Sequence, residues 1–159
     1  MKAQKYSYRF MSTDEVVDVC HFVNSVFDRS VAPLYTKRGR RNFREYADPE
    51  ATSLRIKSDH FVLLATEDGR VDGMIEMRRH RHVSLLFVEP DQQGRGLGKE
   101  LLRRALEICR SADPDLREIT VNSSPNAVEV YERMGFETTG REQTINSVRS
   151  TPMRLRLEG

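Results

Sequence analysis

The chain has 159 residues and a formal net charge of +2, with 26 Lys and Arg against 24 Asp and Glu. A chain of this length suits one domain with a buried core, so we expect a single domain over residues 1–159. A charge so close to neutral argues against a protein built chiefly to neutralise nucleic-acid phosphates.

The apolar segments and the cysteines indicate where the chain resides. No stretch approaches 18 apolar residues, and residues 1–5 are followed by no apolar signal core. Cys20 and Cys109 each fall in an apolar, helix-like segment, which favours buried free thiols, although the sequence alone leaves a disulfide open. We therefore expect a cytoplasmic protein with no membrane partner.

The first predicted elements are a strand and a helix. Residues 4–10 alternate aromatic and polar side chains, which predicts a strand. Ser12 or Thr13 is predicted to cap a helix, and Ser12 and Glu15 have the spacing of a capping box. This helix fades by 30–33. The apolar face of this helix consists of Val16, Val19, Cys20, Val23 and Phe27.

The middle of the chain predicts a polar helical region and three strands. The helical region covers 37–58 and is broken at Asp48-Pro49. A hairpin follows, with strands at 61–65 and 71–77 around a Gly-containing turn. The next strand, 82–88, ends in a nearly continuous apolar run, which predicts burial on both faces.

The last third of the chain alternates helices and strands. An amphipathic helix runs from Leu97 to Cys109 and ends at Asp113-Pro114. Then come a strand at 118–121, a short helix at 127–134 ended by Gly135, and strands at 136–139 and 153–157. This order predicts an α/β sandwich around one sheet, not a regular βαβ repeat.

The most informative segment is a glycine-rich turn between a strand and a helix. Gly94, Gly96 and Gly98 follow Pro90 at alternate positions, and an amphipathic helix starts at once. Glycine lets the backbone approach a ligand and adopt positive φ at little cost. The first amides of a helix have no intrahelical partner and lie at its positive end. Together these features predict an anion site suited to a pyrophosphate.

Two common phosphate motifs do not match this turn. A P-loop requires Ser or Thr after its lysine, but Glu100 follows Lys99 and Gln93 replaces the first glycine. The dinucleotide fingerprint requires Gly-x-Gly-x-x-Gly, whereas these three glycines are evenly spaced. The remaining alternative is a tight strand-to-helix turn without a ligand.

The pattern Gln93-x-x-Gly96-x-Gly98, with Val88 and Pro90 upstream, resembles the signature of the GCN5-related N-acetyltransferases. The resemblance implies a three-layer α/β/α sandwich around a mixed, mostly antiparallel sheet, and acetyl-CoA as the acyl donor. It also implies that a splayed strand ending at Phe87-Val88 binds the pantetheine arm through its backbone. The residues implied to cradle the pyrophosphate are Gln93, Gly94, Arg95, Gly96, Leu97, Gly98 and Lys99.

A second segment resembles the family's other CoA motif. Ala127 stands four residues before Tyr131, and Gly135-Phe136 follow it at the expected distance. When an amine attacks a thioester, the sulfur leaves as a thiolate that a nearby phenol can protonate. We therefore predict Tyr131 as the general acid, against the alternative of a packing residue on an amphipathic helix.

The sequence departs from the family seven residues before this tyrosine. Many members carry asparagine there, in contact with the pantetheine arm, whereas this chain has Ser124. Asn122 and Asn126 lie close by, and either could replace the missing amide. Asn126 could equally cap the helix that follows.

The acceptor side of the reaction is less well defined. Glu76, among apolar residues on the strand before the glycine loop, is the predicted base, because partial burial would raise its pKa. Period-two alternation could instead point Glu76 at solvent, and Glu89 and His82 are weaker choices. No third ligand accompanies His80 and His82, so no metal site is predicted.

A basic run over 37–44 could attract an acidic acceptor or RNA, but such runs are usually solvated helix faces. The resemblance places residues 28–44 and 140–151 beside the acceptor. It also suggests a homodimer, because related enzymes are often dimers. The predicted function is acetyl transfer from acetyl-CoA to a primary amine, and the alternative is a catalytically weak acyl-CoA-binding or regulatory module.

Overall fold

The computed structural model describes residues 6–158, so the first two residues of the strand expected at 4–10 lie outside it. Eight strands form a sheet in the order β1-β2-β3-β4-β5-β8-β6, with β7 paired to β8. Only β4 and β5 are parallel, and the other pairs are antiparallel. The strands are β1 (Ser7–Phe10), β2 (His60–Glu67), β3 (Arg70–Arg78), β4 (His82–Val88), β5 (Glu118–Ser123), β6 (Glu137–Thr138), β7 (Gln143–Ile145) and β8 (Val148–Arg156).

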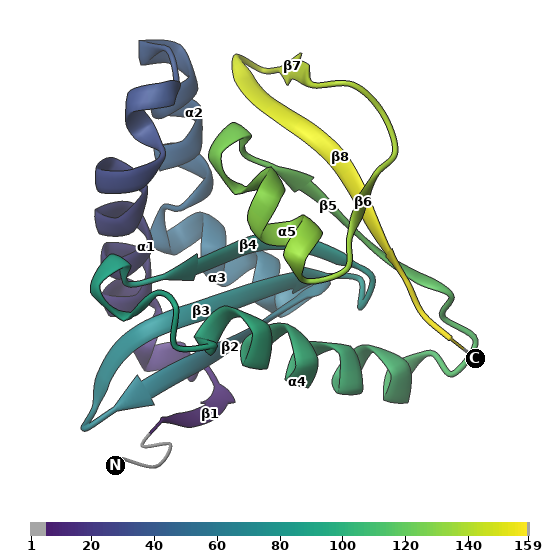
Figure 1. Ribbon diagram of the computed structural model, residues 1–159. Helices are drawn as coiled ribbons and strands as arrows, with labels where there is room; N and C mark the ends of the chain where they lie inside the picture. The colour runs from purple at the N-terminus through teal and green to yellow at the C-terminus, as the bar shows by residue number, and fades with distance from the viewer. Residues whose placement is uncertain (1–5, 159) are drawn as a thin grey trace.

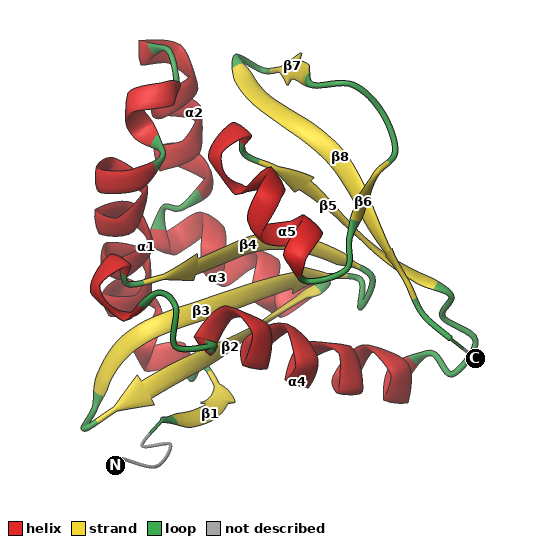
Figure 2. Cartoon of the chain, in the orientation of Figure 1, coloured by secondary structure: helices red, strands yellow, loops and turns green. Residues whose placement is uncertain are grey.

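Helices cover both faces of this sheet, as Figures 1 and 2 show. α1 and α3 pack on one face, and α4 packs against β2 and β3 on the other. This arrangement confirms the predicted three-layer sandwich around a mixed, mostly antiparallel sheet. The α-helices are α1 (Val16–Ser30), α2 (Lys37–Tyr46), α3 (Pro49–Ser58), α4 (Leu97–Ala112) and α5 (Val128–Arg133).

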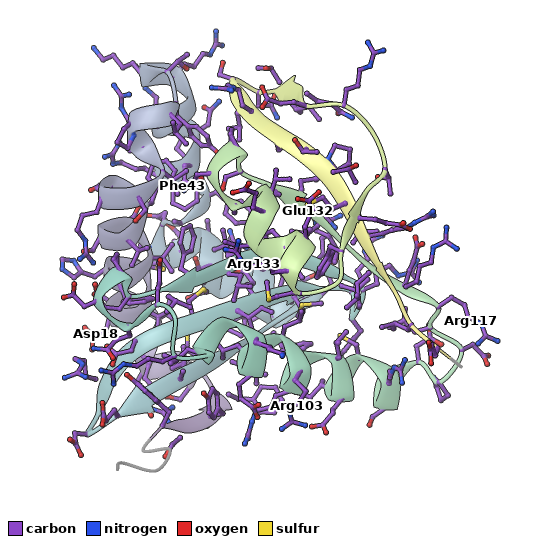
Figure 3. The ribbon with its side chains drawn as sticks, in the orientation of Figure 1. Asp18, Phe43, Arg103, Arg117, Glu132 and Arg133 are labelled. Atoms are coloured by element: carbon purple, nitrogen blue, oxygen red, sulfur yellow. The ribbon has the colours of Figure 1, made fainter. Side chains whose placement is uncertain are left out.

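The two-residue alternation of β2 and β3 divides the core between the two helical layers. Leu63 and Ile75 pack with buried residues of α4, while Val62 and Met74 pack with Val19 on α1. Both strands are therefore buried on both faces. Outside this core, Arg103 lies on the exposed side of α4, where it pairs with Glu100 and Glu107 (Figure 3).

Local capping chemistry sets where the helices begin. Ser12 and Glu15 form the predicted capping box, which starts a short 3-10 turn before α1. The break expected at Asp48-Pro49 is confirmed: the Asp48 side chain accepts from the Glu50 and Ala51 amides and starts α3. Thr36 caps α2 in the same way.

The cysteines lie where the sequence predicts them, whereas the last strand is longer than predicted. Cys20 and Cys109 are buried free thiols, as expected, and burial raises the pKa of Cys109 to about 12. The strand expected at 153–157 begins earlier, at Val148, because it pairs with β5, β6 and β7. Within residues 6–158, no helix is long and apolar enough to cross a membrane.

Candidate active site

The sheet opens between β4 and β5. These strands pair at only two register positions, His82 with Thr120 and Val83 with Val121. Beyond Val83 they separate toward the side where α1 and α2 lie (Figure 1). The β3–β4 register also shifts there, because Met77 faces Val83 and Glu76 faces Leu85, which leaves Ser84 as the extra residue of a bulge. The remainder of β4 has β3 on one edge only.

A cavity of about 330 Å³ lies at this opening. Its walls come from β4, β5, the start of α5, the β7–β8 hairpin, α1, α2 and the α1–α2 segment (residues 31–36). Phe43 lies on the side of α2 that faces the cavity (Figure 3). Of the residues predicted from the sequence, Phe87, Asn122, Ser124 and Tyr131 line the cavity.

The glycine turn leads from β4 into α4. Gly94 and Gly96 have φ of 87° and 84°, and Gly96 is the N-cap of α4 without a side-chain capping bond. A Cβ at either glycine would meet no atom within 4 Å, so the backbone conformation and not crowding requires glycine here. Gly98 differs from the expectation, because it lies inside α4 and has no positive φ. The turn therefore leaves the first amides of α4 uncapped by a side chain.

The residues predicted to bind the pyrophosphate differ in whether their side chains or only their backbone amides are accessible to a ligand. Arg95 and Lys99 have exposed side chains, whereas Leu97 is buried in the core and can offer only its amide. The Gln93 side chain donates to the Val88 carbonyl at 3.1 Å, which ties the turn to the end of β4. Val88 also contacts the position that a Cβ of Gly98 would occupy, at 3.7 Å.

A tether that the sequence did not reveal fixes the start of this turn. The Tyr6 hydroxyl bonds Asp72 at 2.9 Å and Gln92 at 3.1 Å, and the Glu89 amide donates to the Asp72 carbonyl at 2.8 Å. Burial, with the Asp72 carboxylate next, raises the pKa of Tyr6 to about 12, so its hydroxyl stays protonated. Asp72 and Gln92 follow Tyr6 by 66 and 86 positions in the chain. No sequence pattern links residues so far apart, so these hydrogen bonds could not be predicted.

Tyr131 is held on α5 at the inner wall of the cavity. Its side chain is 7% exposed, and its ring packs edge-on against Phe136 with centroids 5.2 Å apart. Burial raises the pKa of the Tyr131 phenol, so the group is protonated at neutral pH. A proton donor to a departing thiolate must itself be protonated, and the Tyr131 phenol, beside the opened strands, meets this requirement.

The residues around the missing asparagine have distinct roles. Asn122 and Ser124 line the cavity. Asn126 does not cap a helix: its amide donates to the Ser30 carbonyl at 3.2 Å, and its oxygen accepts from the Ser124 hydroxyl at 2.8 Å. Asn126 therefore links the start of α5 to the end of α1.

Glu76 occupies a position that does not suit its predicted role as base. It is fully buried on the face of the sheet that packs against α1 and α3, and it is not among the residues that line the cavity. Arg55 binds its carboxylate through two nitrogens at 2.7 and 3.2 Å, and His60 Nδ1 lies 2.5 Å away. Because β3 is covered on both faces, a carboxylate there needs buried partners, and these partners occupy its oxygens.

The two weaker candidates for the base are also engaged. Glu89 forms a two-point ion pair with Arg29 at 2.9 and 3.0 Å. His82 Nδ1 lies 2.7 Å from the Thr120 hydroxyl, and burial, followed by the charge of Arg78, lowers its pKa to about 4. Among residues 6–158, no group of three His, Cys, Asp or Glu is arranged to hold a metal.

A family model for the acetyltransferase (GNAT) domain matches residues 31–157. The chain belongs to this family. GNAT acetyltransferases take their acetyl group from acetyl-CoA. The match covers α2 through β8 and includes all the residues that line the cavity except Phe27 on α1.

Individual GNAT proteins are similar to this chain at two levels. The peptidyl-lysine N-acetyltransferase YjaB of Salmonella typhimurium is 32% identical over 72 residues, 45% of this chain and 47% of that protein. The chain thus spans less than half the length of that relative. Two solved structures share the fold: a GCN5-related N-acetyltransferase of Rhodopseudomonas palustris (TM-score 0.83, 20% identity, 99% of both chains) and the PaiA N-acetyltransferase of Thermoplasma acidophilum in complex with coenzyme A (TM-score 0.79, 19% identity, 97% and 100%).

Proposed function

We propose that this GNAT domain transfers an acetyl group from acetyl-CoA to a primary amine by direct attack of the amine on the thioester. The observation that carries the proposal is the position of Tyr131. A protonated, buried phenol lines a cavity at the point where β4 and β5 separate. The glycine turn before α4 begins at the end of the same strand β4.

The donor is proposed to lie along β4 and end at the glycine turn. The uncapped amides from Gly94 to Gly98 suit the pyrophosphate, and the exposed Arg95 and Lys99 add positive charge. The edge of β4 that β5 leaves free, next to Phe87 and Val88, suits backbone hydrogen bonds to the pantetheine amides. Asn122 or Ser124 is proposed to contact the pantetheine arm from the β5 side.

The chemistry requires one proton donor and the loss of one proton from the amine. The amine nitrogen of the neutral amine forms a bond to the acetyl carbon, the carbon–sulfur bond breaks, and Tyr131 donates its proton to the thiolate. The proton that the attacking nitrogen loses passes through solvent and restores the Tyr131 phenol. Because Glu76 is enclosed by Arg55 and His60, we do not assign it the amine proton. Holding the amine against the thioester supplies most of the acceleration.

The names of the relatives do not select an acceptor. They include a peptidyl-lysine acetyltransferase, an L-amino acid acyltransferase and aminoglycoside acetyltransferases. Two further expectations stay predictions: the cytoplasmic location and the homodimer.

The deciding experiment measures free CoA released from acetyl-CoA with a panel of primary amines, in parallel with CoA binding by calorimetry. We expect amine-dependent CoA release together with acetylated product by mass spectrometry. Tight CoA binding with no turnover for any amine class would instead support the acyl-CoA-binding module.

A further inference from the structure

The part of the cavity away from the donor side has an aromatic wall. Phe27 stacks on Phe43 with centroids 3.9 Å apart, and Tyr35 packs edge-on against Phe27 at 5.5 Å. Phe43 in turn meets Phe87 on β4 edge-on at 6.0 Å. This packing joins α1, the α1–α2 segment and α2 to the strand that is proposed to carry the thioester. Aromatic groups so arranged form a rigid apolar surface.

The residues that line the cavity carry no formal charge. Within the part of the chain that the structure describes, the lining side chains are aromatic, aliphatic or neutral polar. None of these lining residues is Asp, Glu, Lys, Arg or His. The titratable ones are Tyr35, Tyr46 and Tyr131, and burial raises the pKa of all three, so they are neutral at physiological pH. The cavity therefore offers an acceptor no carboxylate.

Three carboxylates near the cavity already have cationic partners. Asp28, next to Phe27, pairs with Arg44 at 2.7 Å. Glu142, before β7, pairs with Arg149 at 3.0 Å. Glu76, behind Tyr46, pairs with Arg55, whose guanidinium lies 3.6 Å from the Tyr46 ring centre.

The basic side chains of α2 add no charge to the cavity, because they lie outside its lining. Lys37, Arg40, Arg41 and Arg44 line a separate surface groove, and Asn42, Phe43 and Tyr46 supply the cavity side of the helix. A second ammonium on the acceptor would thus be buried without a counter-ion, which is unfavourable.

The β7–β8 hairpin closes one side of the acceptor half of the cavity. The Asn42 side chain on α2 donates to the Asn146 carbonyl at 2.5 Å. One turn earlier, Gly39 lies so close to the hairpin that a Cβ there would be 2.4 Å from the Ser147 carbonyl oxygen. Because helix and hairpin touch, the pocket has walls on both sides, which suits a compact molecule better than an extended peptide.

From this lining we propose that the acceptor is a small amine with a single nitrogen on an aromatic body, bound as the neutral amine. The proposal rests on the proposed acetyl transfer. Tyr35, Phe43 and Tyr46 contact the ring of the acceptor, and its amine faces the thioester near Tyr131. A pocket without charged side chains, which partly removes a bound amine from water, favours the neutral form of that amine. The acceptor can therefore lose its proton before attack without a carboxylate base.

The test compares kcat/KM for 2-phenylethylamine, spermidine and a lysine-containing peptide. We expect kcat/KM for the aromatic amine to exceed the other two values by about tenfold or more, because a second ammonium would enter the pocket without a counter-ion. A higher kcat/KM with spermidine or the peptide would overturn the acceptor class while leaving acetyl transfer intact. Turnover with none of the amines would instead count against the proposed function.

A charge placed in the pocket provides a matched pair of variants. Ile145 lines the cavity and is 55% exposed, so Ile145→Asp and Ile145→Asn should both fold. The aspartate should shift the preference toward spermidine by about tenfold, since it supplies the missing counter-ion. The asparagine should slow both amines to a similar extent. Equal preference ratios in the two variants would contradict the inference.

The pH dependence supplies an independent readout. If the neutral amine binds, kcat/KM rises with pH until the acceptor's own amine is deprotonated. Replacing 2-phenylethylamine by its less basic β,β-difluoro derivative should therefore move this rise to lower pH. A rise at the same pH for both amines would indicate a base on the protein and would contradict binding of the neutral amine.

Discussion

At the scale of single residues, burial decides which groups can take part in the reaction. Tyr131 and Glu76 were both predicted as catalytic from their chemistry. Tyr131 is buried with its pKa raised, at the wall of the cavity. Glu76 is buried between β3 and the layer of α1 and α3, outside the cavity lining, with Arg55 and His60 around it. A pattern of alternating residues gives the relative face of Glu76 but not which layer covers that face.

Replacing Tyr131 by phenylalanine removes the proposed proton donor and keeps the ring that packs on Phe136. We expect kcat to fall about a hundredfold, because general acid catalysis contributes at least that much in typical enzymes. The affinity for CoA and the melting temperature should stay close to those of the wild type. A steady-state assay at saturating acetyl-CoA across pH, with calorimetry of CoA binding, checks both statements. Unchanged turnover would remove the general-acid role.

At the scale of elements, the contact between α2 and the β7–β8 hairpin forms one side of the cavity that we propose holds the acceptor. The hairpin turn has Asn146 and Ser147 at φ of 54° and 65°, a conformation that most residues adopt only at a cost. Gly39 permits the approach of the helix to this turn. In the sequence, Gly39 is a weak point in a basic helix, and nothing there links it to a segment more than 100 residues away.

The substitution Gly39→Ala separates this contact from helix propensity. Propensity alone predicts that alanine inside α2 stabilises the protein by about 1 kcal/mol. The added Cβ would instead collide with the Ser147 carbonyl, and such overpacking costs about 1–3 kcal/mol. We therefore expect a lower melting temperature and a severalfold higher KM for the acceptor, with the KM for acetyl-CoA unchanged.

The matched control is Arg38→Ala, which also places alanine on α2 but at an exposed position. It should leave both KM values at wild-type levels. If Gly39→Ala raises the melting temperature and leaves the acceptor KM unchanged, the contact does not shape the pocket.

At the scale of the whole molecule, the sheet consists of two parts, and only two pairs of residues, on β4 and β5, join them. β1 to β4 form one part and β5 with β8, β6 and β7 the other, and only His82 and Val83 of β4 have partners in β5. The opening is thus built into the sheet. A ligand that lies between β4 and β5 would replace the missing strand pairing.

Coenzyme A is therefore expected to stabilise the fold and to protect β4 from hydrogen exchange. Ligand binding adds about 2.7 kcal/mol at a concentration one hundred times Kd. We expect a higher melting temperature and slower exchange at the glycine turn and at Ser84–Val88. 3′-Phospho-ADP, which has the pyrophosphate without pantetheine, should protect the turn but not β4. Unchanged exchange at Ser84–Val88 with CoA would contradict the proposed path of the pantetheine arm.

Features whose chemistry is complete within a few residues could be predicted from the sequence. The glycine turn, the Ser12 capping box, the break at Asp48-Pro49 and the spacing around Tyr131 each depend on near neighbours, and their elements appear where expected. The tertiary structure alone decided the partners of Glu76, the tether from Tyr6 to Asp72 and the contact of Gly39 with Ser147. These depend on groups distant in the chain, which only the packing of helices on both faces of the sheet brings together.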